Sequence, residues 1–207
     1  TLTLAASDGE CSVSCWVVID DIADDSYRHI LGGTHPNIFA WGSYYQNNFK
    51  WYINGSGWQT SNTTIVAGDL YHIVYTKNDT AYKFYVNGTL DWSDTLVAVA
   101  GDLTKFGHGP NHGYLEGIIN EVSAWSTELS LAEVQELFND GVALDARTHS
   151  KSIPTGTGTD YLEGYWRNVG LGEWEDLSQN TNDGTPTNAS DTILLPEGTT
   201  TGKDILG

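Results

Sequence analysis

Methionine is absent from this sequence of 207 residues, cysteine occurs twice, and 9 basic residues stand against 27 acidic ones. The missing methionine predicts that residue 1 is not a translation start. The formal net charge of −18 argues against a nucleic-acid-binding surface, because phosphate backbones attract basic proteins. No stretch approaches the roughly 18 consecutive apolar residues that a membrane-spanning helix needs. We therefore expect neither nucleic-acid binding nor membrane insertion.

The two cysteines, Cys11 and Cys15, lie in the alternating run CSVSCWVVID. In an extended strand, which rises about 3.3 Å per residue, their Cα atoms are ~13 Å apart and out of disulfide reach. We expect two buried free thiols.

Hydrophobic residues make up 39% of the chain and aromatic residues 12%, which is enough for the packed core of one domain. Residues 11–19, 70–76 and 81–86 alternate in the manner of β-strands, and the first has one strongly buried face. The dipeptide Asn87-Gly88 is a strong hairpin signal. The 23 glycines fall mostly between such segments. The pattern predicts an all-β, antiparallel fold.

Residues 130–141 break this pattern. Ser130 and Glu133 have the spacing of a helix capping box, and Gly141 is placed to end a helix. One apolar stripe runs along the segment, formed by Leu131, Val134, Leu137 and Phe138. We expect one short helix that packs on the sheets.

Three segments in succession, residues 11–20, 68–91 and 115–141, resemble signatures of the laminin-G-like branch of the concanavalin A-like lectin/glucanase superfamily. The resemblance covers residues 2 to 141 and is strongest at Tyr85-Val86-Asn87-Gly88 and at GIINEV followed by the capped helix. It implies an antiparallel jelly-roll β-sandwich with one short helix. The tail around residues 195–198 is similar to segments of bacteriophage structural proteins.

The chain departs from the family in the order of its parts. The Trp-containing strand and Asn-rich turn that usually open such domains resemble residues 165–185, which come last here. A circular permutation that completes this same domain is favoured, because an open sandwich edge invites aggregation. The alternative is that the segment begins a repeat or completes another subunit. We predict one domain over 1–207, with a main body (1–147), a linker or surface crossing (148–160), completing strands (161–195) and a tail (196–207).

Residues 39–58 are unusually rich in aromatic side chains. Sugar rings stack their C–H faces on such rings while nearby amides bind the hydroxyls, so this segment could bind a glycan. The candidates are Trp41, Tyr44, Tyr45 and Trp58. The alternative is that strand alternation buries half of the rings in the core and leaves the rest as cross-strand pairs.

Two loops could also carry ligands. In the loop 107–113, Pro110 and three glycines prevent the helix that would bring two histidines onto one metal. The resemblance implies instead that Asn111 and His112 line a ligand groove. The loop 176–184 is rich in the oxygen donors that calcium prefers, and Asp176, Asn180 and Asp183 are the candidate ligands of an irregular site.

Hydrolysis of a glycoside needs two carboxylates about 5 to 9.5 Å apart. The strand 117–125 supplies only Glu121, and it does not reproduce the Glu-x-Asp-x-x-Glu pattern of the glucanases in the superfamily. We therefore expect no enzyme and interpret Glu121 as a structural residue that accepts hydrogen bonds.

The leading hypothesis is a non-catalytic carbohydrate-binding or adhesion module on an outer surface, such as that of a virion. The charge favours a neutral glycan. Other surface proteins or copies of the same chain are possible partners. The alternative is a structural capsid-decoration or fibre domain that binds no glycan. A glycoside hydrolase or polysaccharide lyase is the third hypothesis.

Overall fold

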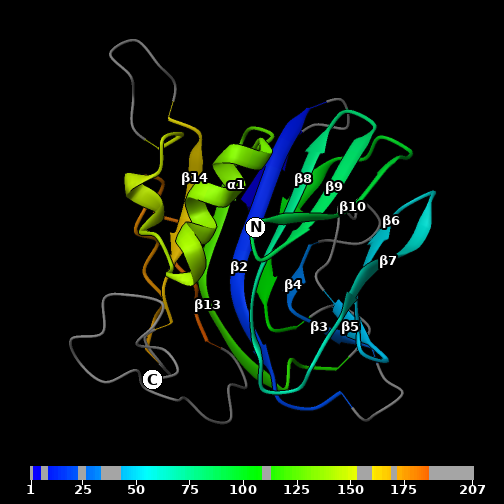
Figure 1. Ribbon diagram of the computed structural model, residues 1–207. Coiled ribbons are helices and arrows are strands. Elements are labelled where there is room, and N and C mark those ends of the chain that lie inside the picture. The colour runs from blue at the N-terminus through cyan, green and yellow to red at the C-terminus, as the bar shows by residue number, and fades with distance from the viewer. Residues whose placement is uncertain are drawn as a thin grey trace.

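The computed structural model describes residues 2–5, 9–22, 27–33, 43–108, 113–152, 160–168 and 172–186, without the side chains of Ala5, Ser43 and Tyr44. Its strands form two main antiparallel sheets (Figure 1). The six-stranded sheet has the order β10(Thr89–Thr95), β9(Ala81–Val86), β8(Leu70–Asn78), β2(Glu10–Ile19), β13(Gly117–Trp125) and β14(Leu162–Trp166). The four-stranded sheet has the order β3(Arg28–His29), β5(Ser43–Tyr45), β6(Asn48–Ile53) and β7(Gly57–Thr64). Two short pairs join β1(Leu2–Ala5) to β11(Gly101–Leu103) and β4(Leu31–Gly32) to β12(Lys105–Phe106).

The central strand β2 is buried on both of its faces. Its odd-numbered residues, from Cys11 to Ile19, lie in the core between the sheets, where Phe49, Trp51 and Ile53 of β6 also lie. On the opposite face Trp16 stacks on Phe138 of the helix. The expectation of one strongly buried face is therefore too narrow, because the helix covers the other one. Both cysteines are buried free thiols, as predicted.

The only α-helix of the described chain, α1(Leu131–Phe138), packs across β2 and β13 (Figure 1). The predicted capping box is present, because Ser130 and Glu133 each accept a hydrogen bond from the other's backbone N–H. The helix ends at Asn139 in the left-handed conformation, not at Gly141 as expected. Asparagine tolerates that conformation, so the last turn closes earlier and a short 3₁₀ turn, η1(Asn139–Gly141), follows.

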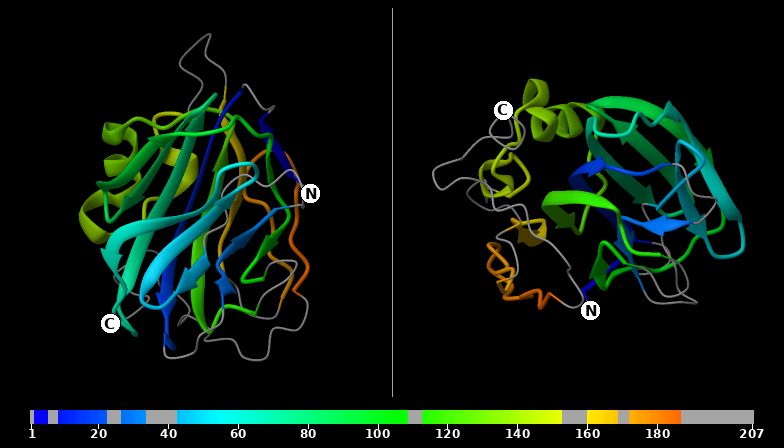
Figure 2. Two further views of the ribbon diagram at one scale, coloured as in Figure 1. Left: turned by 90° about the vertical axis from the view of Figure 1, so that its right-hand side faces the viewer. Right: turned by 90° about the horizontal axis from the view of Figure 1, so that it is seen from below.

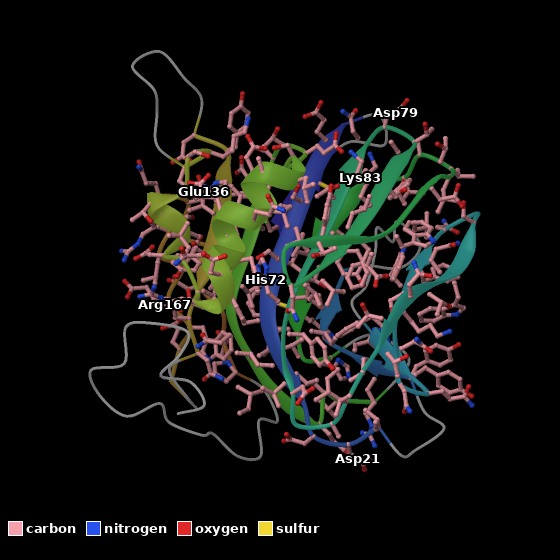
Figure 3. All side chains as sticks on the ribbon, viewed as in Figure 1. Asp21, His72, Asp79, Lys83, Glu136 and Arg167 are labelled. Carbon is pink, nitrogen blue, oxygen red and sulfur yellow. The ribbon has the colours of Figure 1, made fainter. Side chains whose placement is uncertain are left out.

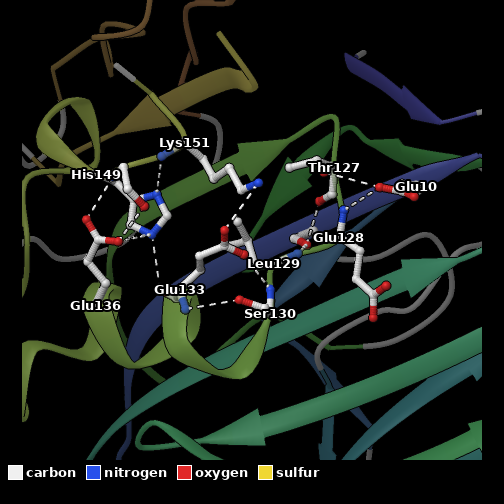
Figure 4. Close-up of polar contacts among 11 residues, drawn as sticks. Glu10, Thr127, Glu128, Leu129, Ser130, Glu133, Glu136, His149 and Lys151 are labelled. Atoms are coloured by element: carbon white, nitrogen blue, oxygen red, sulfur yellow. Dashed lines mark hydrogen bonds and ion pairs between the residues drawn. The ribbon is translucent and has the colours of Figure 1, made fainter. Parts of the chain in front are cut away.

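Side chains from the segment after the helix hold α1 in place (Figure 4). The buried ring of His149 contacts the Glu133 carbonyl oxygen through Nε2 at 3.0 Å and accepts a hydrogen bond from the Lys151 backbone N–H at Nδ1. Lys151 also forms an ion pair with the Glu133 carboxylate. A second 3₁₀ turn, η2(Ala146–Thr148), precedes these residues. No helix in the described ranges has the length and apolar character required to cross a membrane.

The strand β14 lies beside β13 in the same chain, with Val122 opposite Trp166. Isolated bridges pair Trp166 with Asp176 and Trp174 with Gly184, so the residues after β14 lie along the free side of this edge strand. The all-β fold with antiparallel sheets and one short helix is confirmed. The permutation and the domain limits remain predictions, and the last part of the completing segment and the tail lie outside the described residues.

The β8–β9–β10 meander places Gly88 directly under the helix. A Cβ atom at Gly88, whose φ is +73°, would lie 2.8 Å from Phe138 Cδ1. We predict that Gly88→Ala lowers the free energy of unfolding by about 1–3 kcal/mol more than Gly68→Ala. Gly68 is the matched control, because its φ is +83° and a Cβ there meets nothing within 4 Å. Urea unfolding of both variants checks this, and equal losses would contradict the proposed contact.

His72 is a residue of β8 whose ring faces the helix (Figure 3) and contacts Trp16 and Phe138. Burial lowers the pKa of His72 to about 3, and within the described structure its Nδ1 has no hydrogen-bond partner. Between pH ~6.5 and pH ~3 the unfolded chain therefore binds a proton at His72 that the folded chain does not. Over this range the free energy of unfolding falls by up to about 1.4 kcal/mol for each unit by which the pH is lowered.

We predict that His72→Phe removes this contribution. Urea unfolding between pH 6.5 and pH 4.5 should show a shallower loss of stability in the variant than in the wild type. The titrating carboxylates are common to both proteins and cancel in the comparison. Identical pH slopes would mean that His72 is protonated in the folded state as well.

Candidate functional site

The four-stranded sheet presents aromatic side chains on its outer face. Because Phe49, Trp51 and Ile53 point into the core, the alternate residue Tyr52 points outward. Tyr52 lies directly opposite Trp58 of β7, so both rings share the outer face. The left view of Figure 2 looks onto this β6–β7 hairpin.

Four rings form one continuous group, named here the aromatic row: Tyr45, Tyr27, Trp58 and Tyr52. The Tyr27 ring stacks on Tyr45 with centroids 4.5 Å apart and on Trp58 with centroids 4.4 Å apart. Tyr52 meets Trp58 edge-on at 5.5 Å. Trp58 is 37% exposed, so part of the row remains open to a ligand.

Burial and the neighbouring Tyr45 raise the pKa of Tyr27. The Tyr27 hydroxyl therefore stays protonated at neutral pH and can both donate and accept a hydrogen bond. Beyond Tyr45 the chain turns through Gln46 and Asn47, which are exposed and have positive φ. Their amide groups lie next to the row in sequence.

The structure brings two of the predicted aromatic residues, Tyr45 and Trp58, into the same group. Trp41 and the side chain of Tyr44 lie outside the described residues. Phe49 and Trp51 are buried, so the core interpretation holds for that half of the segment. The sequence prediction missed Tyr27, because it joins the row through the pairing of β3 with β5, which local sequence does not reveal.

Asn111 and His112 also lie outside the described residues, but the ends of their loop contact Tyr27 and the strand β3 that follows it. The Gly113 backbone N–H donates to the Tyr27 carbonyl oxygen at 3.1 Å. Arg28 forms an ion pair with Glu116 at 2.8 Å, and the rings of His108 and Tyr114 lie 4.5 Å apart. The two sequence-predicted ligand regions thus meet at residues 27 and 28.

The predicted calcium ligands lie in one loop, where their side chains form hydrogen bonds with the backbone. Asp176 is buried, and its carboxylate accepts the N–H groups of Tyr165, Ser178 and Asn182. Asp183 accepts the backbone N–H of Asp176, and the Asn180 amide donates to the Leu162 carbonyl oxygen. Across the described ranges, no three His, Cys, Asp or Glu side chains are grouped to hold a metal. Calcium binding remains a prediction.

Glu121 occupies a bulge in β13 with a φ of +48°. Its carboxylate accepts a hydrogen bond from the Tyr165 hydroxyl and forms an ion pair with Arg167 at 3.0 Å. Burial raises the pKa of Glu121, while Tyr165 and Arg167 oppose that rise. Arg167 also reaches Asp145 at 3.6 Å, and Asp145 pairs with Arg147 at 2.6 Å. Both carboxylates are thus bound by arginine side chains, which is an arrangement suited to joining β13, β14 and η2.

Residues 2–135 match the sequence model of the concanavalin A-like lectin/glucanases superfamily. The chain belongs to this superfamily, and the predicted resemblance is confirmed. Among curated proteins, none matches the sequence.

Solved structures with a similar fold come from distant proteins. A candidate carbohydrate-binding protein of Bacteroides ovatus aligns with a TM-score of 0.63 at 14% identity, over 85% of this chain and 51% of that one. A heptameric SAP-like pentraxin of Limulus polyphemus aligns with a TM-score of 0.54 at 16% identity, over 67% and 73%. A sialidase of Trypanosoma rangeli aligns with a TM-score of 0.51 at 17% identity, over 64% and 23%. The chain spans about half the length of the Bacteroides protein, and at these identities the likeness shows the fold alone.

Replacing Asp176 tests what its carboxylate does. Asp176→Ala leaves the buried N–H of Tyr165 and the partly buried N–H groups of Ser178 and Asn182 without their acceptor, and we predict a loss of about 2–4 kcal/mol of unfolding free energy. Asp183→Ala, which removes the acceptor of one such group, should lose clearly less. Urea unfolding with Ca²⁺ and with chelator measures both effects. Equal losses would contradict the structural role, whereas a calcium-dependent stability that disappears in Asp176→Ala would support the calcium prediction.

Proposed function

We propose that this protein is a non-catalytic carbohydrate-binding module and that the aromatic row is its binding surface. The observation that carries the proposal is the row itself, in which Trp58 remains partly exposed on an outward sheet face. Aromatic rings and the apolar C–H faces of sugars stack well, and flanking polar groups fix the orientation. The tyrosine hydroxyls and the amides of Gln46 and Asn47 supply such polar groups.

Membership in a lectin-like superfamily and the fold shared with the Bacteroides ovatus protein support carbohydrate binding in general terms. The finer statements are part of the proposal: adhesion on an outer surface such as a virion, with other surface proteins or copies of this chain as partners. The net charge favours a neutral glycan over a sulfated polyanion.

The superfamily fold is shared by enzymes and non-enzymes. We therefore infer the non-catalytic role from the contacts that the carboxylates make. Glu121 pairs with Arg167, and Asp145 pairs with Arg147. The Asp176 carboxylate accepts hydrogen bonds from backbone N–H groups. A hydrolase would need a carboxylate pair flanking a bound sugar. The second candidate function, a structural decoration or fibre domain, is favoured by the stacking of Tyr27 between two rings, since such a surface also suits a protein contact.

The test is a glycan array probed with the wild type, Trp58→Ala and Tyr161→Ala, each shown to be folded by circular dichroism. We predict saturable binding that Trp58→Ala weakens roughly tenfold or more, because a partly exposed stacking surface is lost. Tyr161 is the matched control, since it lies beside β14 and contacts Lys151, away from the row. Parallel arrays with Ca²⁺ and with chelator test a metal requirement.

Two outcomes would contradict the proposal. Binding that survives unchanged in Trp58→Ala would place the site elsewhere on the molecule. The absence of binding across a broad array would favour the structural domain, and release of reducing sugar from a polysaccharide panel would instead show an enzyme.

A further inference from the structure

The strand register places Lys50 on the same sheet face as the aromatic row. On the outer face of β6, Lys50 lies between Asn48 and Tyr52, about 7 Å along the strand from each. Asn48 is opposite Tyr45, and Tyr52 is opposite Trp58. The Lys50 ammonium group is therefore carried by the same sheet face as the rings and between the two ends of the row.

Lys50 is held by a hydroxyl group instead of a carboxylate. Its Nζ donates a hydrogen bond to Thr60 Oγ1 at 2.7 Å, from the residue directly opposite on β7. In the described part of the chain Lys50 has no ion pair, although acidic residues outnumber basic ones threefold. Arg28, Lys83, Arg147, Lys151 and Arg167 each pair with a carboxylate, whereas Lys105 on β12, like Lys50, has no ion pair among the described residues.

An ammonium group offers three N–H donors, and Thr60 takes one of them. Two donors remain for a ligand, and a charged acceptor binds such donors more strongly than a hydroxyl does. The repulsion from the net charge of −18 comes from the whole surface, and salt screens it over about 8 Å at physiological ionic strength. We therefore expect the attraction of Lys50 to outweigh that repulsion for a carboxylate at hydrogen-bond distance.

We propose that the aromatic row binds an acidic saccharide whose sugar carboxylate is held by Lys50 while a sugar ring stacks on Trp58. This inference deepens the proposed function and depends on it. The preference for a neutral glycan came from the net charge of the whole chain. The local arrangement of Lys50, Tyr52 and Trp58 instead favours an acidic glycan. The neutral glycan is then the competing outcome of the test.

The probe is trigalacturonic acid compared with its methyl ester, which has the same rings but no carboxylate charge. Binding to the wild type, Trp58→Ala, Lys50→Gln, Lys50→Arg and Lys83→Gln is measured by isothermal titration calorimetry at low and at physiological salt. Lys83 is the matched control, because it lies on β9 of the other sheet and pairs with Glu128. A set of sialylated and desialylated oligosaccharides provides a second acidic sugar class.

We expect the wild type to bind the acid of at least one such pair roughly tenfold more tightly than its uncharged partner, with a preference that weakens as salt is added. Lys50→Gln should lose the preference for the acid and keep weak binding of the uncharged partner. Lys50→Arg and Lys83→Gln should keep the preference for the acid. Equal or tighter binding of the uncharged partners, still dependent on Trp58, would overturn this inference and leave the carbohydrate proposal intact. If no saccharide binds in a Trp58-dependent way, the proposed function itself fails.

Discussion

The structure depends on burying β2 on both faces. One face of this strand contributes to the core between the two sheets, and the other lies under α1, where Trp16 stacks on Phe138. Each neighbour of β2 in the six-stranded sheet, β8 and β13, shares this double burial and continues both contact surfaces. Because interiors are closely packed, a change on one face of β2 is transmitted to the helix as well as to the facing sheet.

The core between the two sheets also determines which side chains lie on the outer face of the four-stranded sheet. The four-stranded sheet contributes Phe49 and Trp51 to the common core, and the strand period of two then places Tyr52 and Lys50 on the outside. No helix covers that face in the described structure, so its rings pack on one another. The stacked arrangement of Tyr27 against Tyr45 and Trp58 is the result.

The polar clusters on the other side of the molecule are built differently. Glu121 and Asp176 sit at irregular points of the chain, a bulge and a turn, where backbone or arginine N–H groups need an acceptor. Satisfying buried donors in this way stabilises the edge formed by β14, since an unpaired buried N–H group costs about 1–3 kcal/mol. In the described structure both carboxylates accept hydrogen bonds that join separate segments of the chain.

Much of the fold could be predicted from local patterns. The alternation in β2, β8 and β9, the Asn87-Gly88 turn and the Ser130–Glu133 capping box act over a few residues, and the structure contains each of them. The end of α1 was misplaced by two residues, because Asn139 and Gly141 can both adopt the left-handed conformation that closes a helix. The burial of the second face of β2 was also missed, since the helix that covers it lies more than a hundred residues away in sequence.

The candidate site also combines features that the sequence predicts with features that depend on the tertiary structure. The sequence by itself determined that Tyr45 and Trp58 lie in one segment rich in aromatic residues and that the chain carries a large negative charge. Only the tertiary structure decided that Tyr27 lies between these rings and that Lys50 shares their face, because both depend on which strands pair and in which register. Register is set by burial of a whole sheet face against a distant core, and a one-residue shift would turn every one of these side chains inward.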